Sequence, residues 1–324
     1  MAVKKNKNPT DKKNIYISLT VCCVLLPVFL FVWIFYGPFE TLRRTWICTA
    51  MSTANHQYLA TAFFSDETIK KYTDEYFSSL NELPQQDKNV VDTNGAKGEI
   101  TVENVSVGLA RGTLMRIPDP SRIDIAVCDY VGNNGMTLDK LMLLEKAVAG
   151  INAGAYADKD GSARGSVPDG VIVKNGEITY IMEDSEDFCI IGFDKNNCLT
   201  VSYAKTAEEI NAMNLRCAVS FGPPLIINGA GLIKESGTSL QPRTAIAQCA
   251  DGSVLFLVLD GRQPSSAGAT LKNVQELLLE YGAVTAANLD GGSSAAMIYK
   301  DELLNSPSDS GELKRIPTAF IVKE

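Results

Sequence analysis

The sequence has almost no histidine and no cysteine spacing that is typical of a metal site. Its only histidine, His56, lies far from the motifs described below, so the main body of the chain cannot form a Ser-His-Asp triad. The eight cysteines include neither a CxxC pair nor a Cys/His set, which excludes the common zinc modules. Positive charge is also scarce, with 30 Lys and Arg against 38 Asp and Glu and a net charge of −8. This balance argues against nucleic acid as the main partner.

The cysteines do not form an obvious disulfide framework either. Five of them are scattered singly through the body of the chain, and an odd number cannot pair completely. Cys189 and Cys198 are close enough in sequence to bridge a short loop in an oxidising compartment. Buried free thiols are the alternative, and the sequence leaves both open.

Long apolar runs are absent except for one near the N-terminus. Residues 15–36 form a stretch of 22 residues without a charge, which is long enough to span a bilayer core of roughly 30 Å as a helix. Five lysines precede it and two arginines follow it, so the N-terminus is expected to face the cytoplasm. A cleaved signal peptide is the alternative, but its apolar region is usually only about 7–15 residues long. We therefore expect a cytoplasmic tail (1–14), a transmembrane signal anchor (15–36) and a single-pass protein of the cell membrane whose remainder is extracellular.

The rest of the chain divides into a stalk and a large domain. Residues 37–98 are expected to form a helical stalk followed by a turn-rich linker, with one helix starting at Ser65 and its acidic neighbours Asp66 and Glu67. Residues 99–324 contain many short alternating or apolar runs that predict strands, and two helical patterns at 137–148 and 270–281. This pattern predicts an α+β domain with a large mixed β-sheet and a few packed helices.

Five short segments place glycine, proline or polar residues at the expected strand ends, where binding groups concentrate. In the last of them, Asp290 is followed by Gly291 and Gly292 and then by two hydroxyls. Such glycines permit positive φ and the close approach of a ligand, and exposed turn amides can bind an anion. The five segments are 151–156 (INAGAY), 220–225 (SFGPPL), 241–246 (QPRTAI), 259–262 (LDGR) and 288–294 (NLDGGSS).

This ordered set resembles the phosphodiester glycosidase family. The resemblance covers roughly residues 100–324 and rests on NAGAY, FGPPLI, QPRTAI, LDGRQPSSAG and NLDGGSS, followed by Asn305-Ser-Pro and Arg315. The short membrane-anchored form is similar to bacterial members often labelled exopolysaccharide-related proteins. The chain departs from the family pattern in two places. DGGSS stands where DGGGSS is usual, and NAGAY stands where NGGFF is common, so we expect the methyl group of Ala153 to narrow the approach to the backbone.

The resemblance implies a hydrolase that cleaves the glycosidic C–O bond of sugar-1-phosphodiesters, in envelope glycopolymers or exopolysaccharide. Guanidinium groups bind phosphate through paired hydrogen bonds, so Arg243 and Arg262 are the expected clamps, with an ion pair to an aspartate as their alternative role. Asp290 is the expected base or nucleophile, and Asp260 is expected to orient an arginine or to bind sugar hydroxyls. The expected substrate-binding residues are Asn152, Thr244, Asn288, Gly291, Gly292, Ser293 and Ser294.

No motif specifies a cofactor. Asp260 and Asp290 offer hard oxygen ligands, so a divalent cation such as calcium stays open. The expected partners are a sugar phosphate or anionic glycopolymer as substrate and the membrane through one N-terminal helix. Two other functions remain: a non-catalytic protein that binds anionic envelope polysaccharide, and a phosphodiesterase that breaks the P–O bond instead.

Overall fold

The computed structural model of the chain separates into two compact units, Met1–Glu75 and Tyr76–Glu324. The second unit therefore begins ahead of the predicted domain start at residue 99. The structure describes residues 23, 25–33, 35–51, 57–78, 83–93, 98–128, 134–157, 165, 167–182, 187–234, 239–308 and 311–324.

The first unit is helical wherever it is regular. Residues 25–33 are helical, and three further helices follow: α2 (Glu40–Met51), α3 (Tyr58–Thr61) and α4 (Asp66–Ser78), whose last three residues fall in the second unit. The predicted start of α4 is confirmed, because the Ser65 hydroxyl accepts a hydrogen bond from the Thr68 amide at 3.3 Å. A small core of apolar and aromatic side chains includes Phe35, Ile47 and Phe64 and holds this unit together.

The predicted tail (1–14) and residues 15–22, 24 and 34 of the predicted anchor lie outside the described residues, as does His56. In the part of the chain that is described, no helix is both long enough and apolar enough to cross a membrane.

The second unit is built from three antiparallel sheets. The α+β class is confirmed, but a large mixed sheet is not, because every pairing among the described strands of these sheets is antiparallel. The seven-stranded sheet has the order β1 (Thr101–Val107), β2 (Ala110–Ile117), β15 (Val254–Leu259), β14 (Arg243–Cys249), β16 (Ala283–Leu289), β12 (Pro224–Ile227), β13 (Ala230–Gly231). The first five-stranded sheet has the order β10 (Leu199–Ala204), β9 (Phe188–Asp194), β11 (Leu215–Ser220), β7 (Val171–Lys174), β8 (Glu177–Ile181). The second has the order β18 (Glu302–Leu303), β17 (Met297–Tyr299), β4 (Ala147–Asn152), β19 (Thr318–Lys323), β3 (Ile123–Val127), and a small ribbon joins β5 (Tyr156–Ala157) to β6 (Val167–Pro168).

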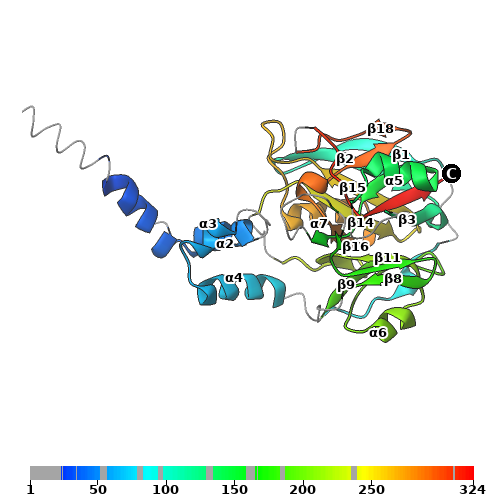
Figure 1. The fold of residues 1–324 in the computed structure, drawn as a ribbon, viewed down its shortest axis with the longest axis horizontal. Coiled ribbons are helices and arrows are strands. Elements are labelled where there is room, and N and C mark those ends of the chain that lie inside the picture. The colour runs from blue at the N-terminus through cyan, green and yellow to red at the C-terminus, as the bar shows by residue number, and fades with distance from the viewer. Residues whose placement is uncertain are drawn as a thin grey trace, which may run out of the picture. The chain divides into compact units, whose positions relative to one another are not determined.

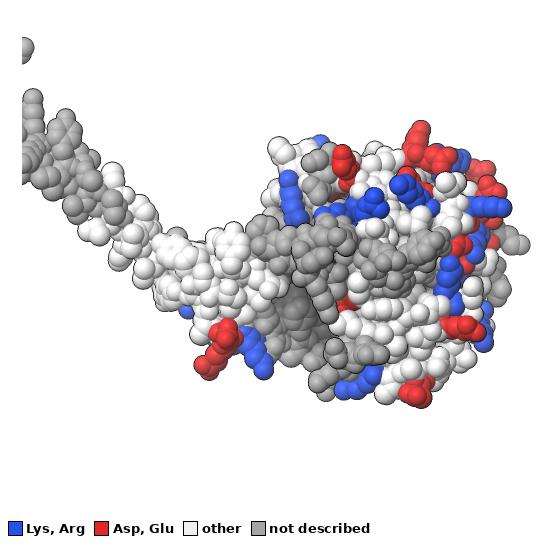
Figure 2. Space-filling model, in the orientation of Figure 1, with Lys and Arg blue, Asp and Glu red and all other residues white. Residues whose placement is uncertain are grey.

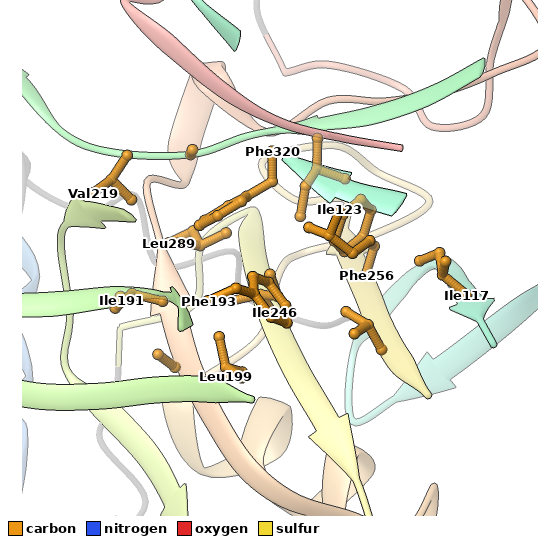
Figure 3. Packing of buried hydrophobic residues seen from close by; sticks show 14 of the residues in the cluster. Ile117, Ile123, Ile191, Phe193, Leu199, Val219, Ile246, Phe256, Leu289 and Phe320 are labelled. Carbon is orange, nitrogen blue, oxygen red and sulfur yellow. The ribbon is translucent and has the colours of Figure 1, made fainter. Parts of the chain in front are cut away.

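The three sheets share one apolar core. Buried side chains from all of them point toward one another in Figure 3, among them Phe256 of the seven-stranded sheet and Phe193 and Phe320 of the other two. The rings of Phe193 and Phe320 meet edge to face, with centroids 6.4 Å apart. Full burial of an aromatic or branched side chain contributes roughly 1.5–3 kcal/mol, so this shared core fixes the sheets against one another.

Each large sheet also has a second apolar face, and a helix covers it. Helix α7 (Leu271–Glu280) covers the seven-stranded sheet, α5 (Leu138–Glu145) the sheet of β3, β4 and β19, and α6 (Ala207–Ala212) the sheet of β7 to β11. The three helices lie on different sides of the unit (Figure 1). The predicted helix 137–148 is too long, because Lys146 takes a left-handed conformation and the chain then enters β4.

The predicted linker is partly bound to the second unit. The side-chain amide of Gln86 donates to Leu199 O at 2.6 Å and accepts from Val201 N at 3.1 Å. It therefore meets the outer edge of β10 much as a neighbouring strand would. Lys88 pairs with the buried Asp194 at 2.7 Å. Residues 83–93 thus belong to the folded domain rather than to a free linker.

The body cysteines are free thiols, and Cys189 and Cys198 form no disulfide. Burial raises the pKa of Cys217 to about 11 and that of Cys189 to about 12. Since the thiolate is the reactive form, both groups are chemically quiet at neutral pH.

Candidate functional site

The predicted site segments meet at one end of the central strands of the seven-stranded sheet. Strand β14 starts there while its two antiparallel neighbours, β15 and β16, end there. Thr244 pairs with Val258 on one side and with Leu289 on the other. Asp260 directly follows β15, and Asp290 directly follows β16. Both therefore lie at the same end of the sheet as Arg243, although almost 50 residues separate Arg243 from Asp290 in the sequence.

Asn152, at the end of β4, joins three of these segments. Its Nδ2 donates to the backbone oxygen of Asp290, and its Oδ1 accepts from the Thr244 hydroxyl at 2.8 Å and from the Ala296 amide at 3.1 Å. Asn152 is 1% exposed and Thr244 is fully buried. Both were predicted to bind substrate, but in this arrangement they hold the turn that carries Asp290.

Asp290 is the most perturbed carboxyl group of the site. Burial raises its pKa to about 6, while the Ser294 hydroxyl, the Gly291 amide and the charge of Lys314 act in the opposite direction. The residue keeps some exposure to solvent, and its amide donates to Ala153 O at 3.0 Å. Asp290 is therefore a carboxyl group that changes its charge close to neutral pH, as a general base or acid needs to do.

The two glycines after Asp290 serve the turn itself. Gly292 has a φ of +61°, as predicted for a left-handed position. A Cβ at Gly291 would lie only 2.6 Å from Pro242 O, so this glycine makes room for a neighbouring backbone rather than for a ligand. The expectation that the amides of this turn bind an anion is wrong for four of them, because they already donate hydrogen bonds within the protein. The Gly291 amide donates to Asp290, and those of Gly292, Ser294 and Ala295 donate to carbonyl groups.

A cationic group does lie at this turn. A Cβ at Gly292 would be 3.6 Å from both Nη1 and Nη2 of Arg262, so the guanidinium lies directly beside the turn. Arg262 has a φ of +59°, and its Nη2 donates to Gln241 Oε1 at a long 3.4 Å. The residue as a whole is exposed, yet burial of the guanidinium lowers the pKa of Arg262. A partly desolvated guanidinium binds an anion more strongly than a fully hydrated one does.

Arg243 takes a different position from the one expected. Its Nε donates to Ala269 O at 3.1 Å and its Nη2 to Ser239 O at 3.0 Å. The guanidinium therefore fastens two loops that border the site. The structure brings the backbone of Arg243 to the Asp290 turn, since a Cβ at Gly291 would lie 3.6 Å from its Cα.

The Asp260 carboxyl group has different hydrogen-bond partners from those of Asp290. Its Oδ1 accepts from Asn305 Nδ2 at 3.1 Å and from the Ser306 amide at 3.0 Å. Burial raises the pKa of Asp260, and these two hydrogen bonds act against that rise. The Asp260 carboxyl group thus holds the turn at residues 305 and 306.

The remaining predicted residues are spread around the Asp290 turn. Asn288 is buried and donates to Gly222 O at 2.8 Å, while its Oδ1 has no partner among the described residues. Ser294 is buried and Ser293 is partly exposed. Ala153 is fully buried in the shared core, so its methyl group is not exposed to solvent at the Asp290 turn.

Three residues near the site were not predicted. Gln241 contacts Arg262, Lys314 acts on the charge of Asp290, and Asn305 bonds Asp260. Asn305 was available as part of the Asn-Ser-Pro motif, whereas no local pattern singles out Lys314.

Metal ligands and surface charge are distributed as follows among the described residues. No group of three or more His, Cys, Asp or Glu side chains among them is arranged to hold a metal ion. On the face shown in Figure 2, acidic and basic side chains of the second unit are interspersed.

The segments that meet at this end of the sheet lie within a region that matches a known family. The model of one family, described as phosphodiester glycosidase, matches residues 145–323, which contain the whole site. The chain belongs to the phosphodiester glycosidase family. The structure of the zebrafish N-acetylglucosamine-1-phosphodiester alpha-N-acetylglucosaminidase catalytic domain, described as auto-inhibited by its pro-peptide, shares the fold. The two have a TM-score of 0.59 and 18% identity over 74% of this chain and 87% of that one.

Two proteins of similar sequence match this chain only in part. The SPbeta prophage-derived uncharacterized protein YomE of Bacillus subtilis (strain 168) is 25% identical over 59% of this chain and 30% of its own length. The N-acetylglucosamine-1-phosphodiester alpha-N-acetylglucosaminidase of Bos taurus is 29% identical over 36% of this chain and 26% of its own length. This chain therefore spans less than a third of these relatives.

Proposed function

We propose that the second unit is a hydrolase that cleaves the glycosidic C–O bond of a sugar-1-phosphodiester. The observation that carries the proposal is that a carboxyl group and a guanidinium group from two different loops meet at one turn. Asp290, whose pKa is raised to about 6, starts the turn, and the Arg262 guanidinium lies beside Gly292 two residues later. A carboxylate next to an anion-binding group suits a substrate with a sugar at one end and a phosphate at the other.

The leaving group explains why this small set of groups is sufficient. Breaking the C–O bond expels a phosphate monoester, whose second pKa is about 6, whereas an ordinary glycosidase must expel a strongly basic alkoxide. The demand for a general acid is therefore low. Arg262 stabilises the negative charge that grows on the departing phosphate, which is the usual way in which a fixed cation lowers a barrier.

Asp290 acts on the sugar side. In its ionised form it attacks the anomeric carbon or removes a proton from the attacking water. The Ser294 hydroxyl and the Gly291 amide hold the carboxylate in place. Since the pKa of Asp290 is raised to about 6, activity is expected to rise as the pH increases through that value. Ser293 and Asn288 are assigned to substrate hydroxyls, and Arg243 to the wall of the site.

The substrate is proposed to be an envelope glycopolymer or exopolysaccharide outside the cell. The uncharged run at residues 15–36 supports a single membrane anchor with a cytoplasmic N-terminus. Most of the described helical residues within it expose apolar side chains, as a helix in lipid does, while Phe31 and Phe35 pack against the core of the first unit. The exposed large side chains among the described residues of this run are Leu25, Leu26, Val28, Phe29, Leu30, Val32, Trp33 and Tyr36.

The test uses the full chain in detergent with a UDP-sugar and an α-glycosyl-1-phosphate ester. Released sugar is assayed in ¹⁸O-labelled water, and label in the sugar is expected because the C–O bond breaks. Label in the phosphate would show P–O cleavage and overturn the mechanism. Binding without any release of sugar would support the alternative function of a non-catalytic polysaccharide-binding protein.

A further inference from the structure

Both the nitrogen and the oxygen of the Asn305 side-chain amide form hydrogen bonds within the site. Its Nδ2 donates to Asp260 Oδ1 at 3.1 Å and to Ala295 O at 3.0 Å. Its Oδ1 accepts from the Met297 amide at 2.9 Å. Ala295 and Met297 belong to the segment that directly follows the Asp290 turn. A single amide therefore connects the loop after β15 to the segment after β16.

These two segments have no direct strand pairing. In the seven-stranded sheet β14 lies between β15 and β16, so the loops that follow them are one strand apart. The loop after β15 carries Arg262, two residues beyond Asp260, and the segment after β16 carries Asp290. The hydrogen bonds of Asn305 are thus a route by which the position of Arg262 relative to Asp290 is set.

Further contacts show that the 305–306 turn is itself fixed. The Ser306 amide donates to the same Oδ1 of Asp260 at 3.0 Å, and Gln263 Nε2 donates to Ser306 O at 2.6 Å. The Leu304 amide donates to Met297 O at 2.8 Å. The loop that carries Arg262 is therefore bonded to this turn on both sides of the arginine, at residues 260 and 263.

We infer that Asp260 and Asn305 are a pair of positioning residues that set the separation of Arg262 from Asp290, and that Asp260 is not the second reacting carboxylate. The inference rests on the proposed function for the identity of the reaction. An error of about 1 Å in the placement of reacting groups can lower a rate by about 100-fold, so such a pair has a large effect without touching substrate.

The chemistry of the pair makes the inference testable by conservative changes. Asp260→Asn keeps an oxygen that can accept from both Asn305 and Ser306, but it removes the carboxylate charge. A reacting carboxylate does not survive this change, whereas a hydrogen-bond acceptor largely does. Asn305→Asp has the opposite character, because it removes both donated hydrogen bonds and places a second carboxylate against Asp260.

The first experiment measures turnover of an α-glycosyl-1-phosphate ester by full-length variants. Asp260→Asn is expected to keep activity within about tenfold of wild type, and Asn305→Asp to lose about 100-fold, mainly through a higher KM because Arg262 is displaced. Ser306→Ala is the matched control, since only the backbone of Ser306 enters the network. A fall in kcat of about 1000-fold in Asp260→Asn with unchanged KM would overturn the inference, because it would mark Asp260 as a reacting carboxylate.

The second experiment does not need turnover. Binding of inorganic phosphate is measured by calorimetry for wild type, Arg262→Ala, Asn305→Ala and the double variant. Because Asn305 acts through Arg262, the double variant is expected to bind no more weakly than Arg262→Ala alone, a non-additive result. Fully additive losses would overturn the inference and leave the proposed function standing. If the wild-type chain bound no phosphate and released no sugar, the proposed function would fail, and the inference with it.

Discussion

Asp260 and Asp290 follow β15 and β16, the two strands that flank β14 in the same sheet, yet their surroundings differ. Asp290 is bonded within its own turn, to Ser294 and Gly291, and burial raises its pKa to about 6. Asp260 is bonded across the chain to Asn305 and Ser306, which act against the rise that burial produces in its pKa. We therefore assign Asp290, with its local donors and strong desolvation, to the chemistry. We assign Asp260, which accepts hydrogen bonds from a distant turn, to holding two loops together.

The largest expected effect is the loss of turnover in Asp290→Asn. The amide is nearly isosteric but is neither a base nor a nucleophile, so the rate should fall at least about 1000-fold, or about 4 kcal/mol in barrier height. Released sugar is the measurement, and circular dichroism checks the fold. Wild-type rates in this variant would remove Asp290 from the mechanism and erase the contrast with Asp260.

The same variant should be more stable than wild type at alkaline pH. The folded-state pKa of Asp290, about 6, lies above the value of about 3.9 expected when unfolded. The folded protein therefore loses stability as the pH rises from about 4 to about 6, and the loss stays constant above that range. Asp290→Asn avoids it, a gain of up to about 3 kcal/mol at pH 8 that vanishes below pH 4.

Urea unfolding followed by circular dichroism at pH 8 and at pH 4 measures this difference. Asp260→Asn is the matched control. Its gain at pH 8 should be smaller, because the hydrogen bonds from Asn305 and Ser306 favour the ionised form of Asp260. An equal gain in both variants would mean that the two aspartates do not differ in the way described.

Asn152→Ala should remove the hydrogen bonds that hold the Asp290 turn and leave the hydrogen bonds of Asp260 unchanged. The change removes the acceptor of the Thr244 hydroxyl and the Ala296 amide, both of which are buried. Buried donors without partners cost about 1–3 kcal/mol, so a loss of about 2 kcal/mol is expected. An acid limb of the pH–rate profile that moves away from pH 6 would show that Asn152 also fixes the environment of Asp290. A change in neither stability nor pH profile would contradict the role assigned to it.

Local signals in the sequence were sufficient for several elements. Helix α7 begins after Thr270, whose hydroxyl accepts from Asn273 N at 3.1 Å, and it ends before Gly282 with φ +85°, so it agrees closely with the predicted helix 270–281. The predicted strand-end segments that follow β15 and β16 and begin β14 also meet at one end of the seven-stranded sheet. The helix ends and strand ends depend on neighbours within a few residues, which a sequence displays directly.

Contacts between distant segments could not be predicted in the same way. Nothing in the local sequence shows that Pro242 O takes the space beside Gly291, or that the Gly292 amide bonds it at 3.0 Å. The turn therefore appeared as an open anion site. The Gln86 side chain on the edge of β10 is a similar case, because a polar, turn-rich segment has the composition of a linker whether or not it is bound.

The smallest expected effect compares two glycines with the same strain and different neighbours. Gly292 has φ +61° and Gly311 has φ +75°, so alanine at either position should destabilise the fold by about 1 kcal/mol. A Cβ at Gly311 has nothing within 4 Å, whereas one at Gly292 would be 3.6 Å from the Arg262 guanidinium, where phosphate is proposed to bind. Gly292→Ala should therefore raise KM several-fold while Gly311→Ala leaves it unchanged, as steady-state kinetics would measure. Equal KM values in the two variants would place the substrate anion away from the Asp290 turn, and the difference between the two aspartates would then concern folding alone.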